Sequence, residues 1–348
     1  MKIEKYIRQI SLPQVGEAGQ QKLGQVSVLV VGAGGLGNAV LPYLAASGIG
    51  AIGIIDGDTI TMSNLHRQIL FSENDLHQLK AKVAYERLRT QFPEVSFVAY
   101  TEFLAAESAL TLFKDYDVIV DATDSIDIRY LINDACVLTN KPFVHASVYR
   151  FQFQIATFNI DGSGTYRCLY PYPPKTVQNC AEAGVMPSTV AIAGLYQANE
   201  VIKYALGIGE LIINKLLLVD TLTNKQHQFS YQKKDHTYIN QIFYEKEYMK
   251  QPAELISFED ALKQDGLFLD VRQPDEEPKL AFENYLQIPL QNLEENLFQL
   301  SGANRIFIFC QSGKRSVVAH HILKKHQLAV FCLKDNAPEI DKKNHKVL

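Results

Sequence analysis

VSVLVVGAGGLG, residues 26–37, is an apolar run rich in β-branched residues that leads directly into a cluster of glycines. The apolar run predicts a strand that is buried on both faces of a parallel sheet. Gly32, Gly34 and Gly35 allow a tight turn and let a phosphate approach backbone N–H groups at the start of the next helix. Asp56 ends the following predicted strand, where a carboxylate can bind ribose hydroxyls. The segment therefore predicts a nucleotide site in a Rossmann-like domain.

Predicted strands and helices alternate outward from this segment, which favours a doubly wound α/β fold. After the helical pattern at 40–45, strands are expected at 51–56, 95–99, 118–120 and 143–146, and helices at 80–91 and 126–138. A strand at 151–160, a long loop at 161–182, a helix at 190–206 and strands at 215–220 and 226–231 complete this part. We expect one domain over residues 1–231.

A second, smaller α/β domain is expected over residues 253–348, after a polar linker at 232–252 that lacks clean periodicity. Its predicted strands are 267–270, 305–309 and 330–333, with a helix at 316–326. The 348-residue length suits two domains.

The composition is that of a soluble globular protein, with 47% apolar and 21% charged residues. The net charge of -4 gives no reason to expect nucleic-acid binding, and the apolar stretches are too short to span a membrane. The first 17 residues lack the apolar core of a signal peptide, and the five cysteines are scattered. We therefore expect a reducing, cytoplasmic setting.

The glycines and Asp56 alone are equally compatible with a nicotinamide-dependent oxidoreductase. Further motifs change this interpretation: DGD at 56–58, SNLHRQ at 63–68, Lys80 at a helix start and DATD at 121–124. Together with YIRQ at 6–9 and GVM at 184–186, this ordered set resembles the ThiF/MoeB family of adenylating enzymes, relatives of the ubiquitin-activating enzymes. The resemblance covers about residues 4–231.

The resemblance implies roles for individual residues. Lys80 would neutralise the phosphates of ATP, and Asp124 would hold Mg²⁺. Arg8 would reach the γ-phosphate of the ATP bound by a neighbouring subunit, which implies a homodimer. The full set implied to contact the nucleotide is Gly32, Gly34, Gly35, Asp56, Asp58, Ser63, Asn64, Leu65, His66, Arg67, Lys80, Asp124 and Ser125.

These residue types suit the adenylation of a carboxylate, in which the carboxylate attacks the α-phosphate and pyrophosphate leaves. Two anions must meet, so cationic donors and Mg²⁺ are expected. Lys82 competes with Lys80 for the cationic role. His77 and Ser125 replace a glycine and an asparagine that are usual in the family, so we expect altered geometry at these two positions.

Cys180 lies in a glycine-flanked loop before the predicted helix at 190–206. In the family a cysteine here can bond to the activated carrier or receive sulfur; a structural loop cysteine is the alternative. Many relatives also bind structural zinc through two C-x-x-C pairs. Here only Cys168 and His236 remain at those positions, so we predict that zinc is absent.

CQSGKRS at 310–316 joins a predicted strand to a helix and, with LDVR at 269–272, resembles the rhodanese family over about residues 254–337. A thiol in such a loop, beside cations at a helix N-terminus, suits a persulfide carrier. The resemblance makes Cys310 the sulfur acceptor, and Arg315 with Lys314 would bind anions. A cysteine phosphatase is the alternative, but four residues between Cys310 and Arg315 favour rhodanese over C-x₅-R.

The leading hypothesis is an enzyme that adenylates the C-terminal glycine of a ubiquitin-like sulfur carrier similar to MoaD or ThiS. The rhodanese-like domain would supply persulfide sulfur for a thiocarboxylate, in molybdenum-cofactor or thiamine biosynthesis. A cysteine desulfurase is a candidate persulfide donor. Two alternatives remain: a plain adenylating enzyme whose rhodanese-like domain only docks partners, because its GHIPGA stretch is lost, and a nicotinamide-dependent oxidoreductase.

Overall fold

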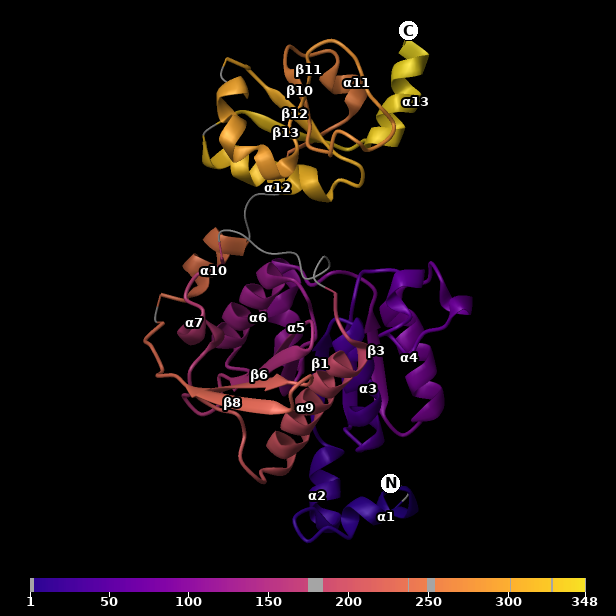
Figure 1. The fold of residues 1–348 in the computed structure, drawn as a ribbon, viewed down its shortest axis with the longest axis vertical. Helices are drawn as coiled ribbons and strands as arrows, with labels where there is room; N and C mark the ends of the chain where they lie inside the picture. The colour runs from indigo at the N-terminus through magenta and orange to yellow at the C-terminus, as the bar shows by residue number, and fades with distance from the viewer. Residues whose placement is uncertain are drawn as a thin grey trace. The chain divides into compact units, whose positions relative to one another are not determined.

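The computed structural model describes residues 3–174, 184–236, 238–248, 254–300, 302–326 and 328–347. The chain divides into two compact units, residues 1–249 and 250–348, and each has its own sheet and its own hydrophobic core (Figure 1). Among the described residues, no helix combines the length and the apolar character that crossing a bilayer requires.

The first unit is built on an eight-stranded sheet with the strand order β3-β2-β1-β4-β5-β6-β7-β8. The five strands from β3 to β5 in this order are parallel, and β6 to β8 extend the sheet in antiparallel fashion. This confirms the predicted doubly wound α/β class. The strands are β1 (Ser27–Val31), β2 (Ala51–Ile55), β3 (Ser96–Tyr100), β4 (Val118–Asp121), β5 (Phe143–Tyr149), β6 (Gln152–Phe158), β7 (Lys215–Asp220) and β8 (Lys225–Ser230).

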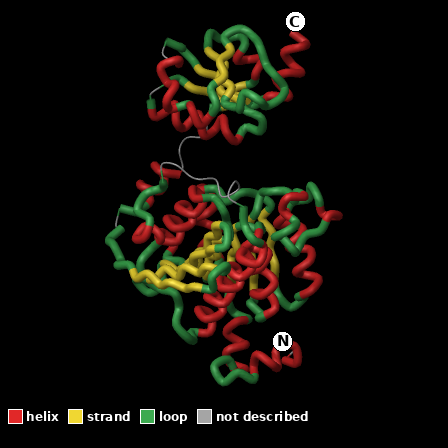
Figure 2. The backbone as a smooth tube through the Cα atoms, in the orientation of Figure 1, coloured by secondary structure: helices red, strands yellow, loops and turns green. Residues whose placement is uncertain are grey.

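Helices cover both faces of this sheet (Figure 2). One face packs against α3 (Gly35–Ala46), α4 (Lys80–Gln91) and α9 (Pro187–Leu206). The other packs against α5 (Ala106–Leu112), α6 (Ile126–Thr139) and the short α7 (Tyr166–Leu169). Two-sided cover explains why the central strands β1, β2 and β4 are nearly continuous apolar runs.

Strand β1 shows how its sequence fits this position. Val28 and Val30 belong to the core cluster on one face, and Leu29 and Val31 belong to the cluster on the other. All four are buried. Burying each side chain contributes roughly 1.5–3 kcal/mol. A polar residue at any of these positions would face an apolar layer.

Five described α-helices of the first unit were not predicted, among them α5 and the short α7, which lies in the segment predicted as a long loop. α1 (Ile3–Ile10) and α2 (Gly16–Leu23) precede β1. α10 (Gln241–Tyr248) lies inside the segment predicted as a linker. Tyr244 is fully buried and donates a hydrogen bond to Ala106 O at 3.0 Å. Residues 241–248 are therefore part of the first unit, and the linker prediction is wrong for them; their anchors are aromatic contacts, which local periodicity does not reveal.

The second unit has a five-stranded parallel sheet with the order β11-β10-β12-β13-β9. The predicted strands at 267–270 and 330–333 are β10 (Leu267–Asp270) and β13 (Val330–Leu333), and the third is β12 (Ile306–Phe309). The remaining elements are β9 (Leu255–Ile256), α11 (Phe258–Ala261), β11 (Tyr285–Gln287), α12 (Lys314–Lys325) and α13 (Ala337–Val347).

Candidate nucleotide-binding site

The glycine-rich loop joins β1 to α3 at the point where the strand order reverses between β1 and β4. Gly32 has φ +103°, and a β-carbon there would lie 2.7 Å from Ala122 O. A β-carbon on Gly37 would lie 2.1 Å from Gly32 O. Gly32 N donates to Ile55 O at 2.8 Å. The glycines are therefore needed for the turn itself and for its close contact with the loop after β4.

Asp56 holds the same loop from the end of β2. Its Oδ2 accepts a hydrogen bond from Ala33 N at 2.7 Å, and its Oδ1 accepts one from Asp58 N at 2.7 Å. Burial raises the pKa of Asp56, and the two backbone donors and Lys80 oppose that rise. The residue implied to bind ribose thus also shapes the phosphate loop.

Lys80 opens α4 and points toward the same region. It is only 7% exposed, and its Nζ lies 3.3 Å from Oδ2 of the exposed Asp58. Lys82, the alternative cation, is exposed on the same helix. Only Lys80 is therefore placed beside the two aspartates of the DGD motif.

The turn before α4 contains His77 in the left-handed region, with φ +67°. His77 N donates to Ile60 O at 2.9 Å, and Lys80 N donates to Asp58 O at 2.9 Å, so this turn aligns Lys80 with the DGD motif. A glycine adopts such a φ without the steric cost that a β-carbon brings. The altered geometry expected at this position is therefore a strained residue in an otherwise regular turn.

We predict that His77→Gly stabilises the first unit by about 1 kcal/mol, because it removes a left-handed non-glycine residue. His77→Ala is the matched control, because it keeps the β-carbon. Urea unfolding should show a gain for glycine and none for alanine. Equal midpoints for the two variants would rule out backbone strain as the cause.

The SNLHRQ segment lies across from the glycine loop. Arg67 Nη1 donates to Ser63 O at 3.0 Å and contacts His66 Nε2 at 2.8 Å. A β-carbon on Gly35 would lie 3.5 Å from the Arg67 side chain, so these two residues, both predicted to contact the nucleotide, are neighbours. Ser63 and His66 are exposed, whereas Asn64 and Leu65 are half-buried.

Asp124 lies in the loop between β4 and α6, at the same sheet edge as the glycine loop. Its side chain is exposed. Ser125 caps α6 by accepting a hydrogen bond from Ile128 N at 3.4 Å, and Ser125 N donates to Thr123 Oγ1 at 2.8 Å. Serine is therefore an effective cap where the family usually has asparagine.

A buried charge network under this loop was missed by the sequence analysis. Oδ2 of the buried Asp121 accepts hydrogen bonds from Arg129 Nε at 3.0 Å and from His145 Nδ1 at 2.7 Å. Arg129 Nη2 also donates to Thr123 O at 3.2 Å. The sequence did contain a signal for this network, because an aspartate at the end of a buried strand needs a hydrogen-bonding or charged partner.

The network fixes the charge of its members. Burial alone would raise the pKa of Asp121, but Arg129 and His145 outweigh burial and hold it below its ordinary value. Burial, with the charge of Arg129, lowers the pKa of His145 to about 4, so its imidazole is neutral near pH 7. Asp121 and Arg129 therefore form the ion pair that positions the Asp124 loop.

One described residue of the predicted site, Arg8, is not brought to it. Arg8 is exposed on α1, which contacts the far end of α3, where Gln9 Nε2 donates to Ser47 O at 3.0 Å. Gly34 caps the other end of this twelve-residue helix, about 18 Å away. Arg8 therefore does not reach the phosphate loop of its own chain. Cys180 lies outside the described residues.

Cys168 and His236 meet where the family's zinc site would be. Cys168 Sγ lies 3.3 Å from His236 Nε2 and accepts hydrogen bonds from Thr165 N and Lys234 N, each at 3.3 Å. In the part of the chain that the structure describes, no third histidine, cysteine or carboxylate joins them. Two ligands do not fit a closed tetrahedral zinc site.

In the second unit, Cys310 follows β12 and is 1% exposed, with its Sγ 3.8 Å from Ser316 Oγ. Arg315, at the start of α12, donates hydrogen bonds to both carboxylate oxygens of Glu276. The bond from Nη2 to Oε2 measures 2.6 Å. Arg315 lowers the pKa of Glu276 to about 2. The predicted anion binder is thus held by a carboxylate.

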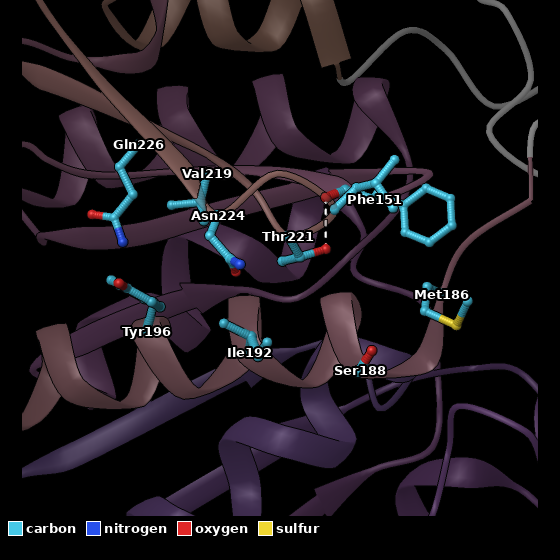
Figure 3. Close-up of a pocket in the computed structure, with 10 residues that line it drawn as sticks. Phe151, Met186, Ser188, Ile192, Tyr196, Val219, Thr221, Asn224 and Gln226 are labelled. Atoms are coloured by element: carbon cyan, nitrogen blue, oxygen red, sulfur yellow. Dashed lines mark hydrogen bonds between the residues drawn. The ribbon is translucent and has the colours of Figure 1, made fainter.

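A mainly apolar groove of about 510 Å³ runs between α9 and the β7–β8 hairpin (Figure 3). Ile192 and Tyr196 on α9 face Val219 and Gln226 of the hairpin. Ser188, at the start of α9, lines both this groove and a smaller hollow of about 180 Å³ that contains Gly35 and Arg67. The two hollows thus share one lining residue at the start of α9.

The fold and this site define a nucleotide-binding α/β protein with a glycine-rich phosphate loop, an adjacent lysine and an exposed aspartate at one sheet edge. Residues 6–240 match the ThiF family, and the chain belongs to that family.

Curated relatives agree with this assignment. A sulfur carrier protein adenylyltransferase of Thermus thermophilus is 45% identical over 227 residues, covering 63% of this chain and 84% of that protein. The adenylyltransferase and sulfurtransferase MOCS3 of Mus musculus is 44% identical over 222 residues. The match covers 63% of this chain and 48% of MOCS3, so it spans about half the length of that protein. A probable molybdopterin-synthase adenylyltransferase of Gracilaria tenuistipitata is 32% identical over 96% of both chains.

Among solved structures, E. coli MccB with ATP is 27% identical, with a TM-score of 0.54. The match covers 62% of this chain and 67% of that one.

Proposed function

We propose that this chain uses ATP to adenylate the C-terminal glycine of a ubiquitin-like sulfur-carrier protein, and that its second unit supplies sulfur to the activated carrier. The observation that carries the proposal is the gathering of the glycine loop, Lys80, Arg67 and Asp124 at one sheet edge. The names of the relatives from Thermus thermophilus, Mus musculus and Gracilaria tenuistipitata support the reaction class.

The nucleotide half of the reaction follows from the positions of these groups. Backbone N–H groups at the start of α3 bind phosphate oxygens, and Asp56 lies where ribose hydroxyls would be. Lys80 and Arg67 offset the negative charge as the carboxylate oxygen bonds to the α-phosphorus and the bond to pyrophosphate breaks. The products are acyl-adenylate and pyrophosphate.

Asp124 offers Mg²⁺ a carboxylate at this edge that no described hydrogen bond or ion pair occupies. Asp124 is exposed, and carboxylate oxygens are the ligands that Mg²⁺ prefers alongside substrate phosphates. When bound, the ion would stabilise charge on the leaving pyrophosphate. The Asp121–Arg129 ion pair holds the loop that presents Asp124.

The groove between α9 and the β7–β8 hairpin is the proposed path for the carrier tail. Its mainly apolar lining suits a folded carrier surface, and Ser188, which also lines the hollow containing Gly35, marks where an extended C-terminal tail would pass toward the glycine loop. The position of Arg8, far from its own phosphate loop, supports a homodimer in which Arg8 acts on the partner subunit's ATP.

Carrier-dependent ATP–pyrophosphate exchange tests the proposal, with MoaD-like and ThiS-like carriers measured separately. Exchange with one carrier establishes the reaction class and identifies the partner. No exchange with either carrier, for a folded protein that binds ATP, would mean that the carboxylate substrate belongs to another class.

For the second unit we propose a rhodanese-like persulfide carrier. The terminal sulfur of a Cys310 persulfide would attack the acyl carbon and release AMP, which leaves an acyl disulfide on Cys310. The Cys180 thiolate would then attack Cys310 Sγ, forming a Cys180–Cys310 disulfide and releasing the thiocarboxylate. The strand–loop–helix position of Cys310 supports this role. The burial of its Sγ and the Glu276–Arg315 ion pair favour the second candidate, a docking unit inert in sulfur transfer.

Cys310→Ala separates these two candidates. We expect exchange within twofold of wild type, because exchange uses only the first unit, and loss of thiocarboxylate formation. Cys332→Ala is the matched control: Cys332 is buried on β13, and burial raises its pKa to about 11, so it is a poor nucleophile. Mass spectrometry of the carrier measures the product. Thiocarboxylate formed by Cys310→Ala would favour the docking unit.

A further inference from the structure

Asn38, one turn into α3, connects the two halves of the nucleotide site. It is 1% exposed, although asparagine is rarely buried to this degree. Its Nδ2 donates to Ala33 O at 2.8 Å and to Gly34 O at 3.0 Å. Its Oδ1 accepts a hydrogen bond from Leu70 N at 2.7 Å. One side chain thus bridges the glycine loop and Leu70, two residues after the SNLHRQ segment.

The two donated bonds orient the loop's N–H groups; Ala33 O is held by the Asn38 side chain, and Gly34 O is held by the side chain together with the helical bond from Asn38 N at 2.9 Å. In a planar trans peptide, the carbonyl of one residue and the N–H of the next point in opposite directions. Drawing the carbonyls of Ala33 and Gly34 toward Asn38 therefore turns the N–H groups of Gly34 and Gly35 away from it. Asp56 holds the Ala33 N–H from the other side. The loop is fixed with consecutive donors available for an anion.

The hydrogen bond that Asn38 accepts from Leu70 N positions the segment that lies across from the glycine loop. Leu70 ends the stretch that contains Arg67, whose side chain lies beside Gly35. A shift of the Leu70 backbone would move Arg67 relative to the glycine loop. Asn38 therefore sets the distance between the backbone donors and the cationic side chain.

We propose that Asn38 is a positioning residue for nucleotide binding, which pre-orients the N–H groups of Gly34 and Gly35 and couples them to Arg67. The inference rests on the proposed function, because it assumes that ATP is the anion bound by this loop. It assigns to Asn38 an effect on the site beyond its contribution to helix packing.

Direct binding of MgATP to the full chain, by calorimetry without a carrier, tests the proposal. For Asn38→Ala we expect a Kd raised by about tenfold to a hundredfold, since phosphate contacts to misoriented N–H groups are weakened or lost. Asn38→Asp keeps the acceptor for Leu70 N but loses the donors to the loop, so we expect the same direction of change.

Asn133→Ala is the matched control for general destabilisation. Asn133 is a fully buried asparagine on α6; it accepts a hydrogen bond from Tyr166 N at 2.8 Å and donates to Asp134 Oδ1 at 2.7 Å. We expect it to lower the melting temperature while leaving the Kd for MgATP within twofold, measured well below both melting temperatures.

Each outcome has a distinct meaning. Weak binding by both Asn38 variants but not by Asn133→Ala supports the proposal. Wild-type affinity in Asn38→Asp would overturn the orientation of the loop by Asn38, and equal losses in Asn38→Ala and Asn133→Ala would reduce Asn38 to a packing residue. A wild-type chain that binds no MgATP would instead refute the proposed function, and this inference with it.

Discussion

Asp124→Ala should reduce carrier-dependent ATP–pyrophosphate exchange by about a thousandfold or more. The proposed Mg²⁺ ligand acts on charge that develops on the leaving pyrophosphate, and losing several kcal/mol of such stabilisation gives a factor of this size. The fold should be unaffected, because the side chain is exposed and α6 is capped by Ser125.

Asp127→Ala provides the control for this prediction. Asp127 is also exposed and lies in the first turn of α6, so both variants lose one negative charge near the same helix terminus. Exchange by Asp127→Ala should stay within a few-fold of wild type. If Asp124→Ala retained a tenth or more of wild-type exchange, Asp124 would not be the Mg²⁺ ligand.

Arg129→Met should destabilise the first unit by about 3–5 kcal/mol. The variant preserves most of the side-chain volume but leaves Asp121, which is fully buried, without its permanent positive partner. His145 can compensate only by binding a proton, which its burial opposes. Urea unfolding followed by a probe in the first unit measures the effect.

Two further variants test the cause of that loss. Lys82→Met removes a positive charge from an exposed position and should change stability by no more than about 0.5 kcal/mol. Asp121→Asn combined with Arg129→Met should recover part of the loss, because no unpaired charge remains buried. A double variant as unstable as the sum of the two single variants would show that the residues do not interact.

The sequence predicted elements best where one pattern was strong over the whole element. The helix at 80–91 and the strands at 215–220, 267–270 and 330–333 coincide with α4, β7, β10 and β13. α1, α2, α5, α7 and α10 were missed, and α10 shows one reason, since its anchor is distant in the sequence. Tyr244, for example, is buried against a residue 138 positions earlier in the chain.

The residues of the candidate site also fall into those that the sequence predicted and those that it did not. The glycine loop, the DGD and SNLHRQ motifs, Lys80 and Asp124 were predicted from residue types in a fixed order, because such chemistry needs those groups at the ends of parallel strands. The partners of these groups were not predicted. The Asp121–Arg129–His145 network, the Glu276–Arg315 ion pair and the Asn38 bridge all join residues from different elements.

The sequence by itself determined the doubly wound α/β fold class, the position of the glycine-rich loop and the family, because buried strands and glycine turns are visible in short stretches of sequence. Only the tertiary structure decided which side chains meet beneath the site, that Arg8 lies far from its own phosphate loop, and that Cys168 pairs with His236. The physical reason is that hydrogen bonds and ion pairs act over about 3 Å, whereas their partners here come from separate elements, and only packing brings them to that distance.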